Sequence, residues 1–216
     1  LPGVPGAEAP AFVALIHGDL DDARDGSGTI AGRPQSVQRI NYDAQLNGRL
    51  EVLGQGGNDY FALDDNSAVT TLDGGAGNDT FQIGQLYGSQ RLPANLTASD
   101  AFDTIATTRG YLSRGATMPV VAQGGDGNDA FVVYSNQAEL RLEGDGGDDS
   151  FIVRGFALAQ VDPVSGNILT GPGGNAVPLT SGLTSTGAPM NVNPGAGNNT
   201  VQYNVNAAVS IDGGSG

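Results

Sequence analysis

Short apolar stretches recur along the chain, and each is bounded by residues that favour turns. Phe131 to Tyr134 and Ala138 to Leu142 flank a Ser-Asn-Gln turn, and the second stretch alternates apolar and polar residues with a period of two. Ala62 to Leu72 has the same form, with Asp64 to Ser67 as its turn. No segment has the 3.6-residue apolar period of an amphipathic helix. The pattern predicts an all-β protein in which about 20 residues form one strand-turn-strand coil.

A motif rich in glycine and aspartate separates these stretches and occurs five times. Each copy has two consecutive Asn or Asp residues, then one variable residue, then an apolar residue. The apolar residues of the five copies are Phe61, Phe81, Phe131, Phe151 and Val201. A short step, as from Phe61 to Phe81, alternates with a long step, as from Phe81 to Phe131. The two steps together form a super-repeat of about 70 residues.

The super-repeat predicts one continuous array. Its units are 1–72, 73–142, 143–211 and the start of another at 212–216. Because stacked repeats bury equivalent apolar side chains in a narrow interior, we expect equivalent phenylalanines to form a ladder. The sets expected to be equivalent are Phe12, Phe81 and Phe151, and Phe61, Phe131 and Val201. The chain starts at Leu1 and stops inside a motif, so we expect a segment of a longer protein.

Composition narrows the chemistry of this array. The 216 residues include 35 Gly, one His and no Cys, which leaves few catalytic side chains and excludes disulfides and thiolate metal sites. The net charge is −14 and no Lys is present, which argues against nucleic-acid binding and favours a cationic partner. No apolar run approaches the roughly 20 residues of a membrane span. We therefore expect a metal-stabilised scaffold that is not an enzyme and has no membrane span.

Calcium is the cation that suits the motif best. Ca²⁺ takes about six to eight oxygen ligands, and glycines allow a turn tight enough to direct several carbonyls at one ion. The best copies are Gly74 to Phe81 and Gly124 to Phe131. Carboxylates repeated at a strand spacing of about 4.8 Å repel each other by roughly 1 kcal/mol in water and several-fold more at a low-dielectric surface. A row of such carboxylates therefore needs a cation.

The spelling GGxGNDxF resembles the nonapeptide GGxGxDxUx of RTX proteins, whose first six residues form a calcium-binding turn. The resemblance implies a parallel β-roll or β-solenoid with Ca²⁺ between successive coils. Turn formation alone explains Asn-Asp and Gly-Asp pairs, but not four aspartates that each stand two residues before an aromatic residue. The predicted metal-binding residues are Asp59, Asp79, Asp129, Asp149, Asn78, Asn128, Asp148, Asp126, Gly74, Gly75, Gly77, Gly124, Gly125, Gly127, Gly144 and Gly146.

Two departures from the RTX pattern limit what the resemblance implies. One motif occurs per coil and a long interval follows every second motif, so we expect calcium along only one edge of the array. The copy at Gly197-Asn198-Asn199 lacks its acidic residue, and the copy at Gly54 to Gly57 is irregular. These two turns should bind calcium weakly or not at all.

The long intervals are predicted to be loop insertions. They lie near 16–45, 84–114 and 155–186, and their charges differ from one to the next. A ligand site repeated in every unit would not vary in this way. Because loops grow at small entropic cost, we expect the insertions to leave the array on one side. The residues expected to pack against the array are Leu86, Tyr87, Tyr111 and Leu112.

Other candidate sites fit the sequence less well. An EF-hand loop starting at Asp21 would have Ala23 at its third position and Gly32 at its twelfth, where a glutamate is needed. His17 is the single histidine, and no GxSxG motif accompanies it. Ice binding is not favoured either, because no regular Thr-x-Thr ladder is present.

Two functional hypotheses remain open at this stage. The first is a calcium-stiffened stalk, adhesin or surface-layer segment of a large protein, outside the cell or on a bacterial cell surface. The second is an accessory calcium module of a secreted protease, lipase or polysaccharide-modifying enzyme, which a catalytic domain elsewhere in the protein would favour. The expected partners are calcium, other units or identical chains joined end to end, and a cell surface or polysaccharide.

Overall fold

The computed structural model describes residues 11–17, 36–42, 48–92, 101–204 and 207–214. They belong to two compact units, 1–47 and 48–216. In the first unit, β1 (Ala11–His17) and β2 (Ser36–Tyr42) pair in the antiparallel sense. The described residues contain no helix, so none of them forms one long and apolar enough to cross a membrane.

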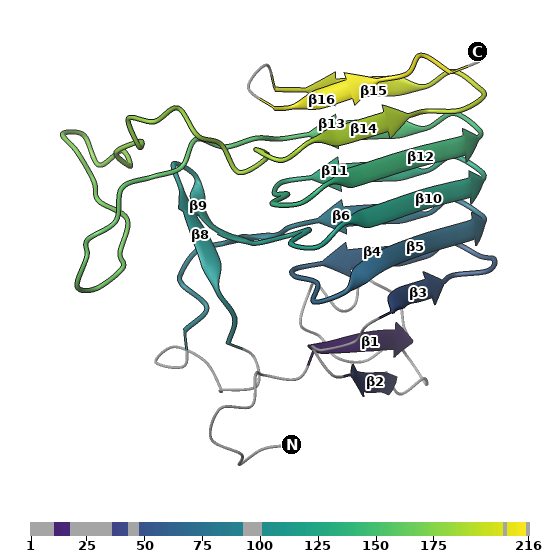
Figure 1. Cartoon of the computed structure of the whole chain (residues 1–216), viewed down its shortest axis with the longest axis horizontal. Helices are drawn as coiled ribbons and strands as arrows, with labels where there is room; N and C mark the ends of the chain where they lie inside the picture. Colours follow the sequence, from purple (N-terminus) through teal and green to yellow (C-terminus); the bar gives the residue numbers. More distant parts are fainter. Residues whose placement is uncertain (1–10, 18–35, 43–47, 93–100, 205–206, 215–216) are drawn as a thin grey trace, which may run out of the picture. The chain divides into compact units, whose positions relative to one another are not determined.

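The second unit is built on two parallel sheets that form two layers (Figure 1). The six-stranded sheet contains, in spatial order, β3 (Arg49–Leu53), β5 (Val69–Ala76), β10 (Val120–Asp126), β12 (Leu140–Gly146), β14 (Met190–Asn193) and β16 (Val209–Ile211). The five-stranded sheet contains β4 (Tyr60–Leu63), β6 (Thr80–Ile83), β11 (Ala130–Val133), β13 (Ser150–Val153) and β15 (Thr200–Tyr203). The predicted all-β class is confirmed, with both sheets parallel.

Strands alternate between the two sheets along the chain, so one strand of each sheet forms one coil. Thr70 pairs with Leu50, one short step earlier in the sequence, and with Val120, one long step later. Both sequence steps therefore advance the chain by one coil, and the additional residues of the long step lie outside the stack. The glycine-aspartate turns join the sheets at one edge, and the insertions leave from the opposite edge (Figure 1). This confirms for the second and third insertions that they leave on one side.

The core between the sheets is a set of stacked rows. Phe61, Phe81, Phe131 and Phe151 occupy equivalent positions, with ring centroids 4.8, 4.7 and 4.6 Å apart and planes within 5°. The last three rings are fully buried, and Val201 continues their row. The rings stack because the strand spacing of about 4.8 Å also sets the distance between equivalent side chains. The predicted phenylalanine ladder is confirmed for these residues.

Phe12 does not continue this register. Its strand, β1, pairs antiparallel with β2, and Phe12 lies opposite Asn41. The prediction that Phe12 is equivalent to Phe81 and Phe151 is therefore wrong, because the ladder requires parallel neighbours in register. Most of the first predicted insertion, 16–45, lies outside the described residues.

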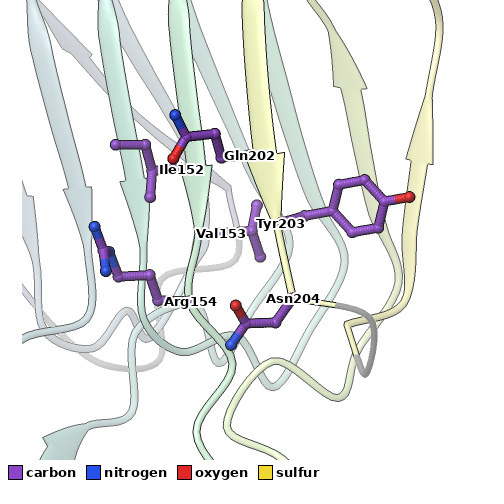
Figure 2. A pocket seen from close by; sticks show the side chains of 6 residues that line it. All are labelled: Ile152, Val153, Arg154, Gln202, Tyr203 and Asn204. Carbon is purple, nitrogen blue, oxygen red and sulfur yellow. The ribbon is translucent and has the colours of Figure 1, made fainter.

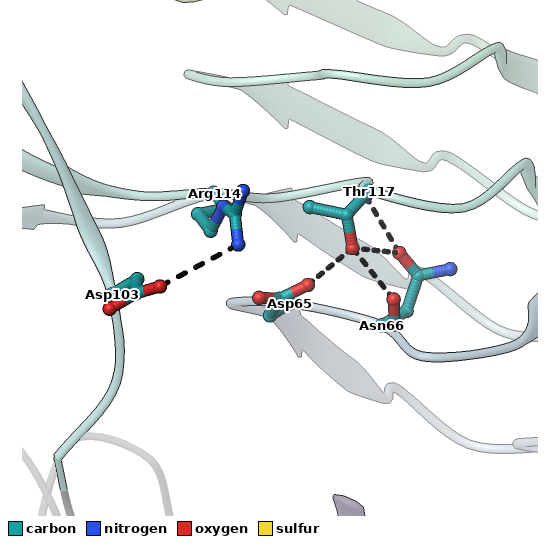
Figure 3. Close-up of polar contacts among 5 residues, drawn as sticks. All are labelled: Asp65, Asn66, Asp103, Arg114 and Thr117. Atoms are coloured by element: carbon teal, nitrogen blue, oxygen red, sulfur yellow. Dashed lines mark hydrogen bonds and ion pairs between the residues drawn. The ribbon is translucent and has the colours of Figure 1, made fainter. Parts of the chain in front are cut away.

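Buried asparagines close the short turns at the insertion edge. Asn66 is 4% exposed, and its Nδ2 donates to the carbonyls of Ala68 (2.8 Å) and Met118 (3.1 Å). Its Oδ1 accepts from the backbone N–H groups of Thr117 (2.8 Å) and Met118 (3.0 Å), and Figure 3 shows Thr117 over the 65–66 turn. Asn136 holds the equivalent turn of the next super-repeat, with its Nδ2 bonded to the carbonyls of Ala138 and Ala188. These asparagines fasten each returning insertion to the preceding coil.

The second and third insertions associate with each other. The second contains an antiparallel sheet of β7 (Leu86–Tyr87), β9 (Gly110–Ser113) and β8 (Thr104–Thr107). Thr107 forms an antiparallel bridge with Leu158 of the third insertion. Arg114 forms an exposed ion pair with Asp103, 3.8 Å apart (Figure 3). The two insertions thus build one lateral lobe, which the sequence did not predict.

Packing in this lobe matches the prediction only in part. Leu112 is fully buried and Tyr111 is 9% exposed, and the Tyr111 hydroxyl accepts the backbone N–H of Ile168 in the third insertion (3.0 Å). The Tyr87 hydroxyl donates to Oδ2 of Asp64 (3.1 Å), which ties the lobe to a coil. Leu86 is 43% exposed, so its predicted packing against the array is wrong. The outer position of β7 in its small sheet explains this exposure.

Candidate metal-binding edge

The turns of the motif edge share one backbone conformation. The five turns are 54–59, 74–79, 124–129, 144–149 and 194–199. Their second residues all have positive φ, from 66° at Asp145 to 99° at Gly125, and their fourth residues are all glycines with φ between 112° and 137°. A side chain at the fourth position would also strike the preceding coil, since a Cβ on Gly77 would overlap the carbonyl of Gly57. Backbone geometry therefore explains the second and fourth glycines of the motif.

The copy at Gly54 to Gly57 belongs to this set despite its irregular spelling. Gln55 adopts φ of 72° where Gly75 and Gly125 stand in other turns, and Gly57 has φ of 112°. Asp145 is the corresponding exception in the fourth turn. Left-handed φ at a non-glycine residue costs roughly 1–2 kcal/mol, so neighbouring coils hold these two residues in place. The first turn therefore has the same backbone as the others despite its irregular sequence.

The aspartates of the motif point into the turns and form a ladder between coils. We call Asp59, Asp79, Asp129 and Asp149 the aspartate ladder. The last three are only 1–2% exposed. Oδ1 of Asp79 accepts the backbone N–H of Asp59 (2.7 Å), and Oδ1 of Asp129 accepts that of Asp79 (2.7 Å). The same bond joins Asp129 to Asp149 (2.8 Å). The carboxylates of Asp79, Asp129 and Asp149 thus each satisfy one backbone donor of the preceding coil.

The other carboxylate oxygen, Oδ2, is buried without a hydrogen-bond partner in all four ladder residues. It lies against the first glycine of its turn, and we call the place where a Cβ of that glycine would lie the space of the turn. A Cβ on Gly54 would lie 2.5 Å from Oδ2 of Asp59 and 2.6 Å from the carbonyl oxygen of Gly74. The equivalent spaces belong to Gly74, Gly124 and Gly144, and face the carbonyls of Gly124, Gly144 and Pro194. A buried carboxylate oxygen beside a carbonyl, with no donor, is costly.

Burial is the largest influence on the pKa of Asp79, Asp129 and Asp149. It raises the pKa of Asp149 to about 6, against the opposing effect of the backbone N–H of Asp129. The neighbouring carboxylates of Asp129 and Asp145 raise that pKa further. Burial also raises the pKa of Asp79 and of Asp129. The protein therefore opposes the charged form of these three carboxylates.

The chain matches no protein-family model, no curated protein and no solved structure.

The asparagines before the ladder residues lie on the outside of the turns. Oδ1 of Asn78 accepts the backbone N–H of Asn128 (2.8 Å), and Oδ1 of Asn128 accepts that of Asp148 (2.9 Å). Asp148 in turn accepts the N–H of Asn198 (2.8 Å). These bonds run in the opposite direction to those of the aspartate ladder. The three predicted ligands Asn78, Asn128 and Asp148 thus already hold successive turns together.

The remaining predicted ligands shape the turns. The side chain of Asp126 is exposed, and its backbone carbonyl accepts the N–H of Gly77 (2.8 Å). The carbonyl of Gly146 accepts the N–H of Gly127 (2.8 Å). Among the described residues, no three Asp, Glu, His or Cys side chains gather around one point. Each space in the ladder therefore offers one carboxylate oxygen together with main-chain oxygens.

Two positions that line these spaces were missed from the sequence. Gly54 faces Asp59 as Gly74 faces Asp79, and Pro194 contributes the carbonyl that faces Gly144. Both residues stand at the first position of a six-residue turn whose last position is the ladder position. The irregular sequence from Gly54 to Gly57 obscures this relation.

The fifth turn has the same frame with different chemistry. Asn199 replaces the ladder aspartate, and its Oδ1 accepts the backbone N–H of Asp149 (2.7 Å). Its Nδ2 donates to the carbonyl of Pro194 in its own turn (3.2 Å). An amide N–H thus supplies the donor that the aspartate ladder lacks.

Surface hollows of the described residues lie away from the ladder. One of about 190 Å³ is at the ends of β13 and β15 (Figure 2). Its lining residues are Ile152, Val153, Arg154, Gln202, Tyr203 and Asn204. Another, of about 720 Å³, lies in the lateral lobe beside Ile105, Leu158 and Leu179. Neither includes a ladder residue, so the motif edge stands apart from both.

Proposed function

We propose that the aspartate ladder binds Ca²⁺ between successive coils of a β-solenoid of the RTX type. The observation that carries this proposal is the set of four buried Oδ2 atoms without donors, each facing a carbonyl of the next coil. A cation in each space would compensate the carboxylate and link two coils through their oxygens. Four spaces, at Asp59, Asp79, Asp129 and Asp149, give four expected ions.

The ligand chemistry favours calcium over other metals. The spaces are lined by carboxylate and carbonyl oxygens, which are hard ligands. Zinc prefers nitrogen and sulfur, whereas the chain has one His and no Cys. Mg²⁺ demands octahedral geometry and keeps several waters, and turns fixed by backbone bonds adapt poorly to that demand. The motif spelling, which resembles the RTX nonapeptide, favours the same ion.

The biological role that fits this chemistry is a calcium-stiffened structural segment of a large extracellular or cell-surface repeat protein. Extracellular calcium modules bind with Kd of about 10⁻⁴–10⁻³ M. Such sites would be filled outside the cell and empty in the cytosol. A chain without cysteines gains by this route the stabilisation that other secreted domains take from disulfides.

Isothermal titration with CaCl₂ tests the proposal on the wild-type chain and two variants. Asp129→Asn removes one ladder carboxylate, so the number of bound ions should fall from four to three. Asp162→Asn changes the charge equally in the third insertion, where Oδ1 caps Ser165, and should leave four ions bound. Equal losses in the two variants, or no binding by the wild type, would contradict specific coordination by the ladder.

A further inference from the structure

The fifth turn differs from the other four at the two positions that line the proposed cation space. Asn199 stands at the ladder position and Pro194 at the position of the first glycine. The backbone is unchanged, since Gly195 has φ of 81° and Gly197 has φ of 120°, as in the other turns. The departures are therefore confined to the lining of the space, while the frame of the turn is kept.

Asn199 satisfies the turn without a cation. Its Oδ1 makes the same bond to the preceding coil as the aspartates do, 2.7 Å from the backbone nitrogen of Asp149. Its Nδ2 takes the place of the second carboxylate oxygen and donates to the carbonyl of Pro194, 3.2 Å away. Two oxygens that would repel are thus replaced by an ordinary hydrogen bond.

Asn199 removes the charge of the turn, and Pro194 fills the place beside it. In the turns with aspartate, a Cβ at the first position would overlap Oδ2 of the ladder residue, as at Gly124 and Gly144. Proline carries a Cβ and a ring at this position, and Pro194 is buried. A proline there is compatible with the Asn199 amide, whereas its Cβ would overlap an aspartate Oδ2 placed as in the other turns.

We infer that the fifth turn is closed by the Asn199 amide instead of by a cation, so that the calcium row has a metal-independent turn built into it. This inference rests on the proposed function for the first four turns. It makes the residue pair at positions one and six of each turn the determinant of metal dependence. Glycine with aspartate gives a calcium turn, and proline with asparagine gives a turn that forms without calcium.

The test exchanges the pair in one turn and measures ions and stability together. In Pro194→Gly/Asn199→Asp, the thermal midpoint in EGTA should fall by about 2–8 °C, because the amide donor is lost and a buried carboxylate is gained. Saturating calcium should restore the midpoint, with five bound ions by titration. Asp129→Asn supplies the reverse exchange, since the new amide should raise the midpoint in EGTA while one ion is lost.

The outcomes separate this inference from the proposed function. If the wild type binds four ions but the double variant keeps its midpoint in EGTA and gains no ion, amide closure of the fifth turn is overturned and calcium binding stands. If the wild type binds no calcium, the proposed function fails. A lowered midpoint of the double variant in EGTA would then still support amide closure, and an unchanged midpoint would overturn it.

Discussion

The two edges of the coil stack join the same strands by different means. At the motif edge, all five turns have the same length and the same backbone, with side chains bonded to the adjacent coils. At the insertion edge, the short turn at Asn66 alternates with the long excursions after Ile83 and Val153. Loops there can grow at about 0.6 kcal/mol per doubling.

The two edges also differ in how their buried polar atoms are satisfied. At the insertion edge, Asn66 and Asn136 each bond backbone groups on two segments, and two neutral oxygens, Oδ1 of Asn136 and Oγ1 of Thr186, are buried without a partner. The motif edge keeps four buried oxygens without donors. Forming a turn does not require such a cost, because the fifth turn has the same backbone without it. The buried Oδ2 atoms of the four aspartates at the motif edge therefore support the proposed cation, because turn formation alone does not require them.

Of the changes that distinguish the two edges, removal of calcium should lower the stability of the protein most. At ten times Kd each site adds about 1.4 kcal/mol, so four sites contribute roughly 5–6 kcal/mol, close to the lower end of a typical total stability. EGTA should therefore lower the thermal midpoint strongly by circular dichroism. Hydrogen exchange should increase first in the turns of the motif edge. An unchanged midpoint would remove the basis for treating the two edges differently.

Filling one space with a methyl group should have the next largest effect. In Gly124→Ala the new Cβ would overlap Oδ2 of Asp129 and lie 2.9 Å from the carbonyl of Gly144. We expect about 2–4 kcal/mol of destabilisation in calcium, from overpacking and the loss of one site. Gly88→Ala in the second insertion is the control, because nothing lies within 4 Å of its added Cβ. Denaturant unfolding of both variants in calcium would contradict the account if their losses were equal.

Truncation at the insertion edge should be independent of calcium. Asn66→Ala leaves the backbone N–H groups of Thr117 and Met118 without their acceptor and should cost about 1–3 kcal/mol. Asn136→Ala should cost less, because Oδ1 of Asn136 has no partner to lose. Both costs should be the same in calcium and in EGTA. A cost for Asn66→Ala that appears only in calcium would show that the two edges are coupled.

The smallest expected effect is the change of the thermal midpoint with pH in the absence of metal. The folded-state pKa of Asp149 is raised to about 6 from its ordinary 3.8, so the folded state binds the proton more tightly than the unfolded state. Its contribution to stability is present below about 3.8 and is lost as pH rises through about 6. Thermal midpoints in EGTA should therefore fall between pH 4 and pH 7. With saturating calcium the trend should reverse, because protons compete for the same carboxylates.

Sequence reasoning succeeded where one coil repeats the next. The spacing of Phe61, Phe81, Phe131 and Phe151 predicted their row. In parallel strands, residues at equivalent repeat positions become direct neighbours when the register is the same from coil to coil. The aspartates followed for the same reason. The spacing from Phe12 to Phe81 is one position short of the super-repeat, and the antiparallel partner strand β2 is specified by residues outside the motif. A spacing close to the super-repeat therefore did not place Phe12 correctly, because no glycine-aspartate motif precedes it.

Contacts between segments without a common motif could not be predicted. The bridge between Thr107 and Leu158 joins two insertions of unrelated composition. The role of Asn199 was predicted only as a lost charge, because its bond to the carbonyl of Pro194 depends on how the turn folds back on itself. The place of Gly54 beside Asp59 likewise depends on the fold of the turn. In each case the decisive contact is set by three-dimensional geometry and has no local signature.

The most direct test is a crystal structure of the chain grown with CaCl₂, with anomalous data collected to locate calcium. The account predicts four anomalous peaks in a row along the motif edge, each about 2.3–2.6 Å from Oδ2 of Asp59, Asp79, Asp129 or Asp149, and none beside Asn199. Density in which those four Oδ2 atoms bind only water or protein donors, with no anomalous peak, would contradict it.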